Sequence, residues 1–160
     1  MSRLLEHLGR QVASSRRLLE IVIVQRDAIR RQDVETVLAS LADVHAEMGF
    51  RARLEQERDS LLAEAAVRRG AAPETLDLED LLAGCPAGEC LQARTMSAEL
   101  RGLIVEVGRI HEQNRVLIRQ ELTFLDHLMR VLSGAPQAGY SANGWLSTTH
   151  QAPTVVDARA

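Results

Sequence analysis

The chain contains no lysine, so all 19 of its basic side chains are arginines. This absence excludes a lysine Schiff base and a P-loop, because the P-loop uses a lysine to reach the phosphates. Aromatic residues make up only 2% of the 160 residues, whereas hydrophobic residues together make up 46%. The core is therefore expected to consist of leucine, valine, isoleucine and alanine side chains.

Glycine and proline are also scarce, with 10 and 4 residues respectively. Most of them lie either between Gly70 and Gly88 or from Gly134 onward. The remaining stretches are long and uninterrupted, which favours helices over a β fold with many turns.

Charges of both signs are interleaved, and 22 acidic against 19 basic residues give a net charge of -3. No basic face is therefore available to attract nucleic acid or anionic lipid. The acidic Glu6 comes too early for a secretory signal, and the longest run of Ile, Leu and Val, Ile21–Val24, is far shorter than the roughly 20 residues of a membrane span. We expect a cytoplasmic protein that binds neither nucleic acid nor membrane.

Apolar residues recur at alternating steps of three and four along most of the chain, which predicts long helices. The first is expected from Arg3 to about Arg31, and the second follows at once, with Asp33 as its N-cap and Gly70 as its stop. The third is expected from about Glu89 to Leu132. Because the first connection is very short, the second helix should fold back antiparallel to the first.

The fold class that follows is all-α, an antiparallel up-down-up bundle of three long helices. Residues 70–90 form a short connector, in which Leu76–Leu82 could make two helical turns. From Ser133 the chain becomes rich in Gly, Ala, Pro, Ser and Thr, so a disordered C-terminal tail is expected. We therefore predict a helical domain over residues 1–133 and a flexible tail over 134–160.

Two polar residues, Asn114 and Glu121, interrupt the apolar stripe of the third helix. A polar residue in a helical core can fix the pairing register at some cost in stability. The same residues could instead supply polar contacts in a binding groove, and the sequence leaves both interpretations open.

The expected exposed faces of the helices carry acidic residues four positions before arginines. This spacing supports helices through pairs worth about 0.3 kcal/mol each. The five pairs are Glu6–Arg10, Asp27–Arg31, Glu47–Arg51, Glu64–Arg68 and Asp126–Arg130.

No motif for catalysis or metal binding is recognisable. A di-iron site in a helical bundle needs paired Glu-x-x-His motifs, and no histidine has a glutamate three positions earlier, so the histidines are expected at surface or boundary positions. Cys85 and Cys90 lack further ligands for zinc. They are either two inert loop thiols or a strained regulatory disulfide. We predict no enzyme, no metal and no cofactor.

The most informative feature of the sequence is a surplus of apolar side chains. Six of the seven residues in Leu18–Val24 are apolar, and consecutive helical positions differ by about 100°, so they cannot all face one way. The end of the third helix has the same surplus, and in an up-down-up bundle it lies at the same end as Leu18–Val24 and the start of the second helix. We expect an apolar groove there that accepts another helix, lined by Ile21, Val24, Leu122, Leu125, Met129 and Leu132.

Self-packing or homodimerisation could instead cover this apolar surface. The tail adds a further candidate, because disordered segments are usually poor in aromatic residues and this one contains Tyr140 and Trp145. Tyr140 either packs back onto the bundle end or belongs to a short docking element over Tyr140–Trp145. We include Tyr140 among the expected partner-binding residues.

Three stretches of the chain resemble a known family. The first helix ends in Ala28-Ile29-Arg30-Arg31-Gln32-Asp33-Val34-Glu35, the second contains Leu54-Glu55-Gln56-Glu57-Arg58, and the third contains Asn114-Arg115-Val116-Leu117-Ile118, followed later by Tyr140-Ser141-Ala142-Asn143-Gly144. In their order and spacing these stretches resemble the FlgN family, the flagellar export chaperones for hook-associated proteins. Gln32 departs from the family, which usually has a glycine in this turn, and the Cys85–Cys90 connector and the tail beyond Trp145 have no counterpart.

The resemblance implies a cytoplasmic chaperone that binds the C-terminal helical segments of FlgK and FlgL, keeps them unassembled and delivers them to the flagellar type III export gate. The expected partners are therefore FlgK, FlgL and the export apparatus, with the chain itself a monomer or a weak homodimer. The alternative function is a coiled-coil structural or adaptor protein that self-assembles through its apolar stripes.

Overall fold

The computed structural model describes residues 3–133, which contain four α-helices, one short 3-10 helix and no strand. The elements are α1 (Arg3–Arg30), α2 (Val34–Arg69), η1 (Pro73–Thr75), α3 (Leu78–Leu82) and α4 (Ala87–Leu132). The predicted all-α class is therefore confirmed. Within this part of the chain, no helix combines the length and apolar character that crossing a membrane requires.

The chain divides into two compact units, Met1–Leu122 and Thr123–Ala160. The first contains α1, α2, the connector and most of α4, and the second begins with the last turns of α4. The predicted flexible tail over 134–160, with Tyr140 and Trp145, lies outside the described residues.

Local hydrogen bonding sets both ends of α2. At its start, Asp33 Oδ1 accepts a hydrogen bond from the Thr36 N–H at 3.0 Å, and this bond, together with a second from the Thr36 hydroxyl, lowers the pKa of Asp33. At its end, Gly70 adopts a left-handed φ of 65°, and its N–H donates to the Ala66 carbonyl. The predicted N-cap and stop are both confirmed.

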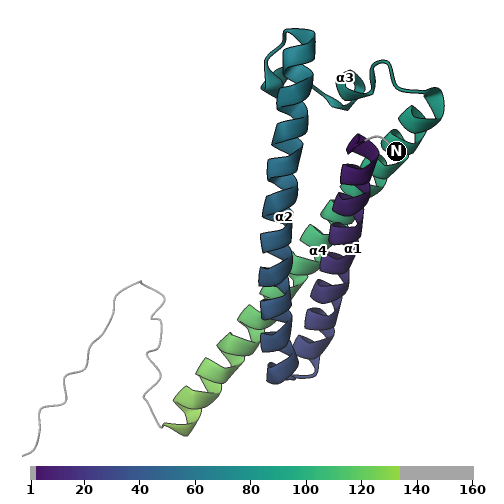
Figure 1. Cartoon of the computed structure of the whole chain (residues 1–160). Coiled ribbons are helices and arrows are strands. Elements are labelled where there is room, and N and C mark those ends of the chain that lie inside the picture. Colours follow the sequence, from purple (N-terminus) through teal and green to yellow (C-terminus); the bar gives the residue numbers. More distant parts are fainter. Residues whose placement is uncertain (1–2, 134–160) are drawn as a thin grey trace, which may run out of the picture. The chain divides into compact units, whose positions relative to one another are not determined.

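In the first unit, α1 and α2 lie side by side as a helical hairpin (Figure 1). The two helices run in opposite directions, because partners of rising residue number on α1 have falling residue numbers on α2. The ion pairs that join them are Arg3–Glu64 at 2.9 Å, Arg10–Glu57 at 2.7 Å and Arg17–Glu47 at 3.1 Å.

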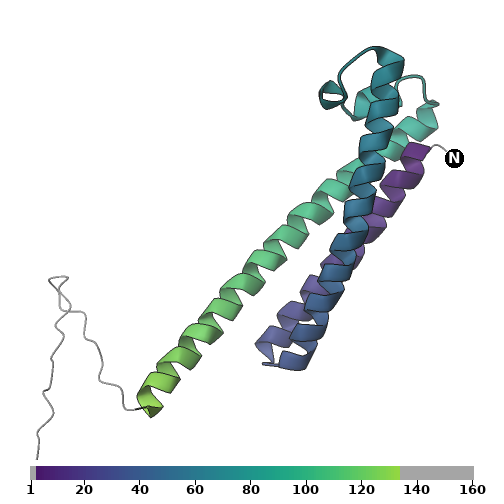
Figure 2. The same cartoon turned by 60° about the vertical axis from the view of Figure 1, so that its left-hand side comes forward.

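The connector lies near the N-terminal end of α1 (Figure 2). A small apolar core joins the two. Leu82 of α3 is only 4% exposed and packs with Leu5, Leu8 and Ala93. Asp77 caps α3, since it accepts a hydrogen bond from the Asp80 N–H at 2.9 Å while the Asp80 carboxylate accepts one from the Asp77 N–H at 3.1 Å. Within Leu76–Leu82, which the sequence marked as two possible helical turns, Leu78–Leu82 form the single short helix α3, and the 3-10 turn η1 lies just before this segment.

Both cysteines are free thiols that pack, half-buried, against this core. Cys90 Sγ donates to the Cys85 carbonyl at 3.5 Å and to the Leu82 carbonyl at 3.7 Å. Of the two interpretations that the sequence left open, the structure contains the pair of thiols.

One expectation about the histidines is wrong. His7 is not a surface or boundary residue, because its side chain is buried between α1 and α2 and the residue is only 2% exposed. Its Nδ1 lies 3.4 Å from the Glu57 carboxylate on α2, whereas the buried Nε2 has no hydrogen-bond partner among the described residues. A charged residue on the neighbouring helix, not visible from the local sequence, supplies the polar contact.

Candidate partner-binding surfaces

The face of α4 that contacts α1 is buried and carries a polar residue at its centre. Ile110 and Asn114 are each 1% exposed. Asn114 Nδ2 donates to the Val22 carbonyl at 2.9 Å and to Gln25 Oε1 at 3.0 Å. These contacts are intramolecular, which favours the register interpretation of Asn114 over the groove interpretation.

The second polar interruption, Glu121, contacts the turn between α1 and α2. Its carboxylate accepts a hydrogen bond from Gln32 Nε2 at 3.3 Å. Gln32 is the residue that stands where the family usually has glycine, and it adopts a left-handed φ of 58°. Glu121 therefore also makes an intramolecular contact, in the last turn of α4 that belongs to the first unit.

A second face of α4 carries a row of exposed apolar side chains, of which Ile104 borders a small cavity with Leu54 of α2. The line of residues that flanks the buried stripe contains Ile104, Ile118 and Leu122, which are 47%, 37% and 60% exposed. In the second unit the last turns of α4 continue the exposure, since Leu125, Met129 and Leu132 are 51%, 66% and 74% exposed. We call this surface the α4 apolar line; it comprises Ile104, Ile118, Leu122, Leu125, Met129 and Leu132.

The end of the hairpin near the α1–α2 turn carries its own exposed apolar surface. We call it the hairpin apolar end, and it comprises two patches: Ile21 and Val24 on α1, and Val34, Leu38 and Leu41 on a face of α2 other than the one that borders Ile21 and Val24. Val24 is half exposed and Ile21 is partly buried, while the three residues of α2 are between 52% and 67% exposed. A shallow cavity of about 190 Å³ lies here between the helices and includes Ile21, Val24 and Ala39 in its lining.

The six helical residues of the predicted groove therefore fall on two surfaces in two units. Ile21 and Val24 belong to the hairpin apolar end, and Leu122, Leu125, Met129 and Leu132 belong to the α4 apolar line. The seventh, Tyr140, lies outside the described residues. The predicted groove residues did not include Leu38 and Leu41, although the sequence placed the start of the second helix, with Leu38 and Leu41, at the same end.

The middle of the hairpin contains a polar layer that the sequence did not reveal. Glu47 is 8% exposed, and its carboxylate accepts hydrogen bonds from the buried Ser14 hydroxyl and from Arg17 Nε at 3.1 Å. Burial raises the pKa of Glu47, but the hydrogen bonds from Arg17 and Ser14 and the charges of Arg17 and Arg51 outweigh it, so the pKa lies below its usual value. This layer is a structural contact of the α1–α2 interface.

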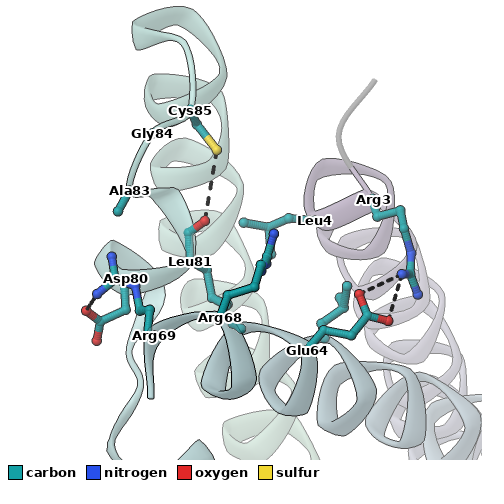
Figure 3. A pocket seen from close by; sticks show the side chains of 12 residues that line it. Arg3, Leu4, Glu64, Arg68, Arg69, Asp80, Leu81, Ala83, Gly84 and Cys85 are labelled. Atoms are coloured by element: carbon teal, nitrogen blue, oxygen red, sulfur yellow. Dashed lines mark hydrogen bonds and ion pairs between the residues drawn. The ribbon is translucent and has the colours of Figure 1, made fainter. Parts of the chain in front are cut away.

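The opposite end of the hairpin contains a larger cavity, of about 520 Å³, between the start of α1, the end of α2 and the connector (Figure 3). Three arginines and two carboxylates line it, and Figure 3 shows that Arg3 pairs with Glu64 and Arg69 pairs with Asp80. Leu4, Leu61, Leu81 and Ala65 add apolar side chains. Among residues 3–133 no group of three or more His, Cys, Asp or Glu side chains is placed to hold a metal ion.

The family model described as FlgN protein matches residues 1–148 of the chain. The chain belongs to the FlgN family. FlgN proteins are flagellar export chaperones that bind hook-associated proteins, so the match confirms the resemblance and identifies the general role and the kind of partner. No curated protein and no solved structure is detectably similar to the chain.

Proposed function

We propose that this FlgN chain is a cytoplasmic chaperone that binds the C-terminal helical segments of FlgK and FlgL and delivers them to the flagellar type III export gate. The observation that carries the proposal is the exposure of the α4 apolar line, where Leu122, Met129 and Leu132 are each at least 60% exposed on one helix. A row of aliphatic side chains along one helix face is the surface to which an amphipathic helix binds.

The chemistry of these residues suits reversible capture of an aggregation-prone segment. Complete burial of one Leu or Met side chain contributes about 1.5–3 kcal/mol, so a few such side chains suffice for a useful affinity. Micromolar binding needs only about 8 kcal/mol. An interface of this strength releases its client without nucleotide hydrolysis, because dissociation at micromolar affinity is fast.

We further propose that the three long helices form the up-down-up bundle that the sequence predicts and that a client segment contacts both apolar surfaces. The contacts between α1 and α4 support this arrangement for the first unit, because they occur in the same order along both helices. These contacts are Arg16–Glu99, Val22–Asn114 and Gln25–Asn114, and Gln32–Glu121 continues the order from the turn that follows α1.

The proposal is tested by placing charges on the α4 apolar line. The double variant Leu125→Asp and Met129→Asp should lose binding of the C-terminal segment of FlgK or FlgL in calorimetry while its helical circular dichroism remains that of the wild type. The single variant Leu38→Asp tests the hairpin apolar end in the same way. Val105→Asp is the matched control, because Val105 is 71% exposed on α4 but lies outside the α4 apolar line. Full binding by the folded double variant would show that the client does not bind at this place.

Self-assembly is the second candidate function, and one observation favours it. The exposed residues Val34, Leu38, Leu41 and Met48 on α2 are spaced by four, three and seven, which is the spacing of a coiled-coil seam. Sedimentation equilibrium distinguishes the two functions. A monomer or weak dimer with free apolar residues supports the chaperone, whereas a tight dimer that buries Leu38 and Leu125 supports the adaptor.

A further inference from the structure

The cavity at the connector end of the hairpin contains one arginine without a carboxylate partner. Arg3 Nη1 donates to both carboxylate oxygens of Glu64 at 2.9 Å, and Arg69 is paired with Asp80. The sequence suggested Glu64 as the partner of Arg68, but Glu64 is occupied by Arg3 on the other helix. Arg68 therefore forms no ion pair with any residue between 3 and 133, and the cavity lining has an excess of one positive charge.

Most of the remaining lining is aliphatic, and Gly84 and the Cys85 thiol complete it. Leu4, Leu61 and Leu81 are half-buried around the cavity and Ala65 is 3% exposed. In Figure 3 the side chain of Arg68 extends towards Leu4 and Leu81. A guanidinium group beside aliphatic side chains matches a carboxylate that is carried next to an aliphatic side chain, because guanidinium binds carboxylate with two parallel hydrogen bonds.

The cavity lies far along α1 from the hairpin apolar end, where the client is proposed to bind. Leu4 at the cavity and Val24 in the hairpin apolar end are twenty residues apart on α1, which corresponds to about 30 Å along the helix. A client helix seated over Val24 thus leaves the cavity open. We propose that this cavity is a docking site for an acidic, leucine-containing segment of a protein partner other than the client, with Arg68 binding its carboxylate and Leu4, Leu61 and Leu81 contacting its aliphatic side chain.

The test is an NMR titration of the full chain, without client, with the peptide acetyl-Leu-Glu-Leu-amide. Saturable shifts at Ala65 and Leu81 are expected, and acetyl-Leu-Gln-Leu-amide should bind more weakly. The variant Arg68→Gln should weaken binding of the acidic peptide by about three- to fivefold, the effect of an exposed ion pair. Raising the salt concentration should reduce the affinity of the wild type in the same direction.

Arg30→Gln is the matched control, because Arg30 is also an exposed arginine in the last turn of a helix but lies at the other end of the hairpin. It should bind the acidic peptide with unchanged affinity. The proposal is overturned if the two peptides bind equally, if Arg68→Gln binds like the wild type, or if shifts occur away from the cavity. It is also overturned if sodium acetate alone produces the same shifts at the same concentration, because the site would then be one for simple anions.

Discussion

Asn114 of α4 donates a hydrogen bond from Nδ2 to Oε1 of Gln25 on α1 across 3.0 Å, and both side chains are almost completely buried. A second bond from the same nitrogen reaches the Val22 carbonyl. Together they join one position on α4 to one position on α1, so a shift of α4 by one turn would leave buried polar groups without partners. Such groups are costly to bury, so this contact supports the register interpretation of Asn114, although Asn114 Oδ1 itself has no hydrogen-bond partner among the described residues.

Replacement of Asn114 by alanine should therefore destabilise the protein by about 1–3 kcal/mol, because the Gln25 oxygen and the Val22 carbonyl lose their shared donor. Urea denaturation followed by circular dichroism measures the change. Gln113→Ala is the control, since Gln113 is the exposed neighbour on the same helix. A variant of wild-type stability that fails to bind client would instead assign Asn114 to the binding surface.

The turn between α1 and α2 predicts that two substitutions of Gln32 differ in stability. Gln32 has a φ of 58°, a conformation that costs a residue with a side chain about 1–2 kcal/mol and glycine almost nothing. Gln32→Gly should therefore be more stable than Gln32→Ala by about 1 kcal/mol, as measured by thermal and urea unfolding.

The comparison of these two variants isolates the backbone effect, because both lose the hydrogen bond to Glu121. Equal stability of the glycine and alanine variants would mean that the turn does not hold a left-handed residue at this position.

The polar layer of the hairpin predicts a pH dependence. The pKa of Glu47 is lower in the folded protein than its usual value of 4.5, so its ionised form stabilises the fold above that pH and the contribution is lost as the pH falls through the folded pKa. Glu47→Gln should thus be destabilised at neutral pH by about 1.5 kcal/mol, the effect of hydrogen bonds to a charged group. The difference from the wild type should shrink below pH 4.5.

Unfolding by urea at a series of pH values from 7 downward measures this difference. Glu20→Gln serves as the control, because Glu20 is an exposed residue of α1. A stability difference for Glu47→Gln that is the same at all pH values would show that the carboxylate charge does not contribute.

The limits of α2 could be predicted from sequence because they depend on residues that act locally. The Asp33 side chain accepts a hydrogen bond from the backbone N–H three residues ahead. Gly70 adopts the left-handed conformation that ends the helix, which glycine does without strain. Neither effect needs knowledge of which helix packs where. The same holds for the buried stripe of α1, where Leu5, Leu8 and Val12, at steps of three and four, are each less than 9% exposed.

The sequence could not predict which apolar helix faces are buried, because hydrophobic spacing does not reveal which other helix packs against a given face. On α2, Val34 and Met48 belong to an apolar pattern of steps of three and four, as Leu54 and Ala65 do, yet the first two are exposed and the last two are buried. The polar contacts were hidden for the same reason. Glu47 lies four residues before Arg51 in the sequence, but its carboxylate pairs with Arg17 on the other helix.

The most direct test of the account is the solvent accessibility of the α4 apolar line with and without client. Paramagnetic relaxation of the methyl groups by a soluble probe measures it for Leu122, Leu125 and Met129 in one experiment. Addition of the C-terminal segment of FlgK or FlgL should strongly reduce the relaxation at these three residues and leave it unchanged at Val67 and Val105, which are 85% and 71% exposed. Undiminished relaxation at Leu125 and Met129 in a saturated complex would contradict the account, because the client would then bind elsewhere.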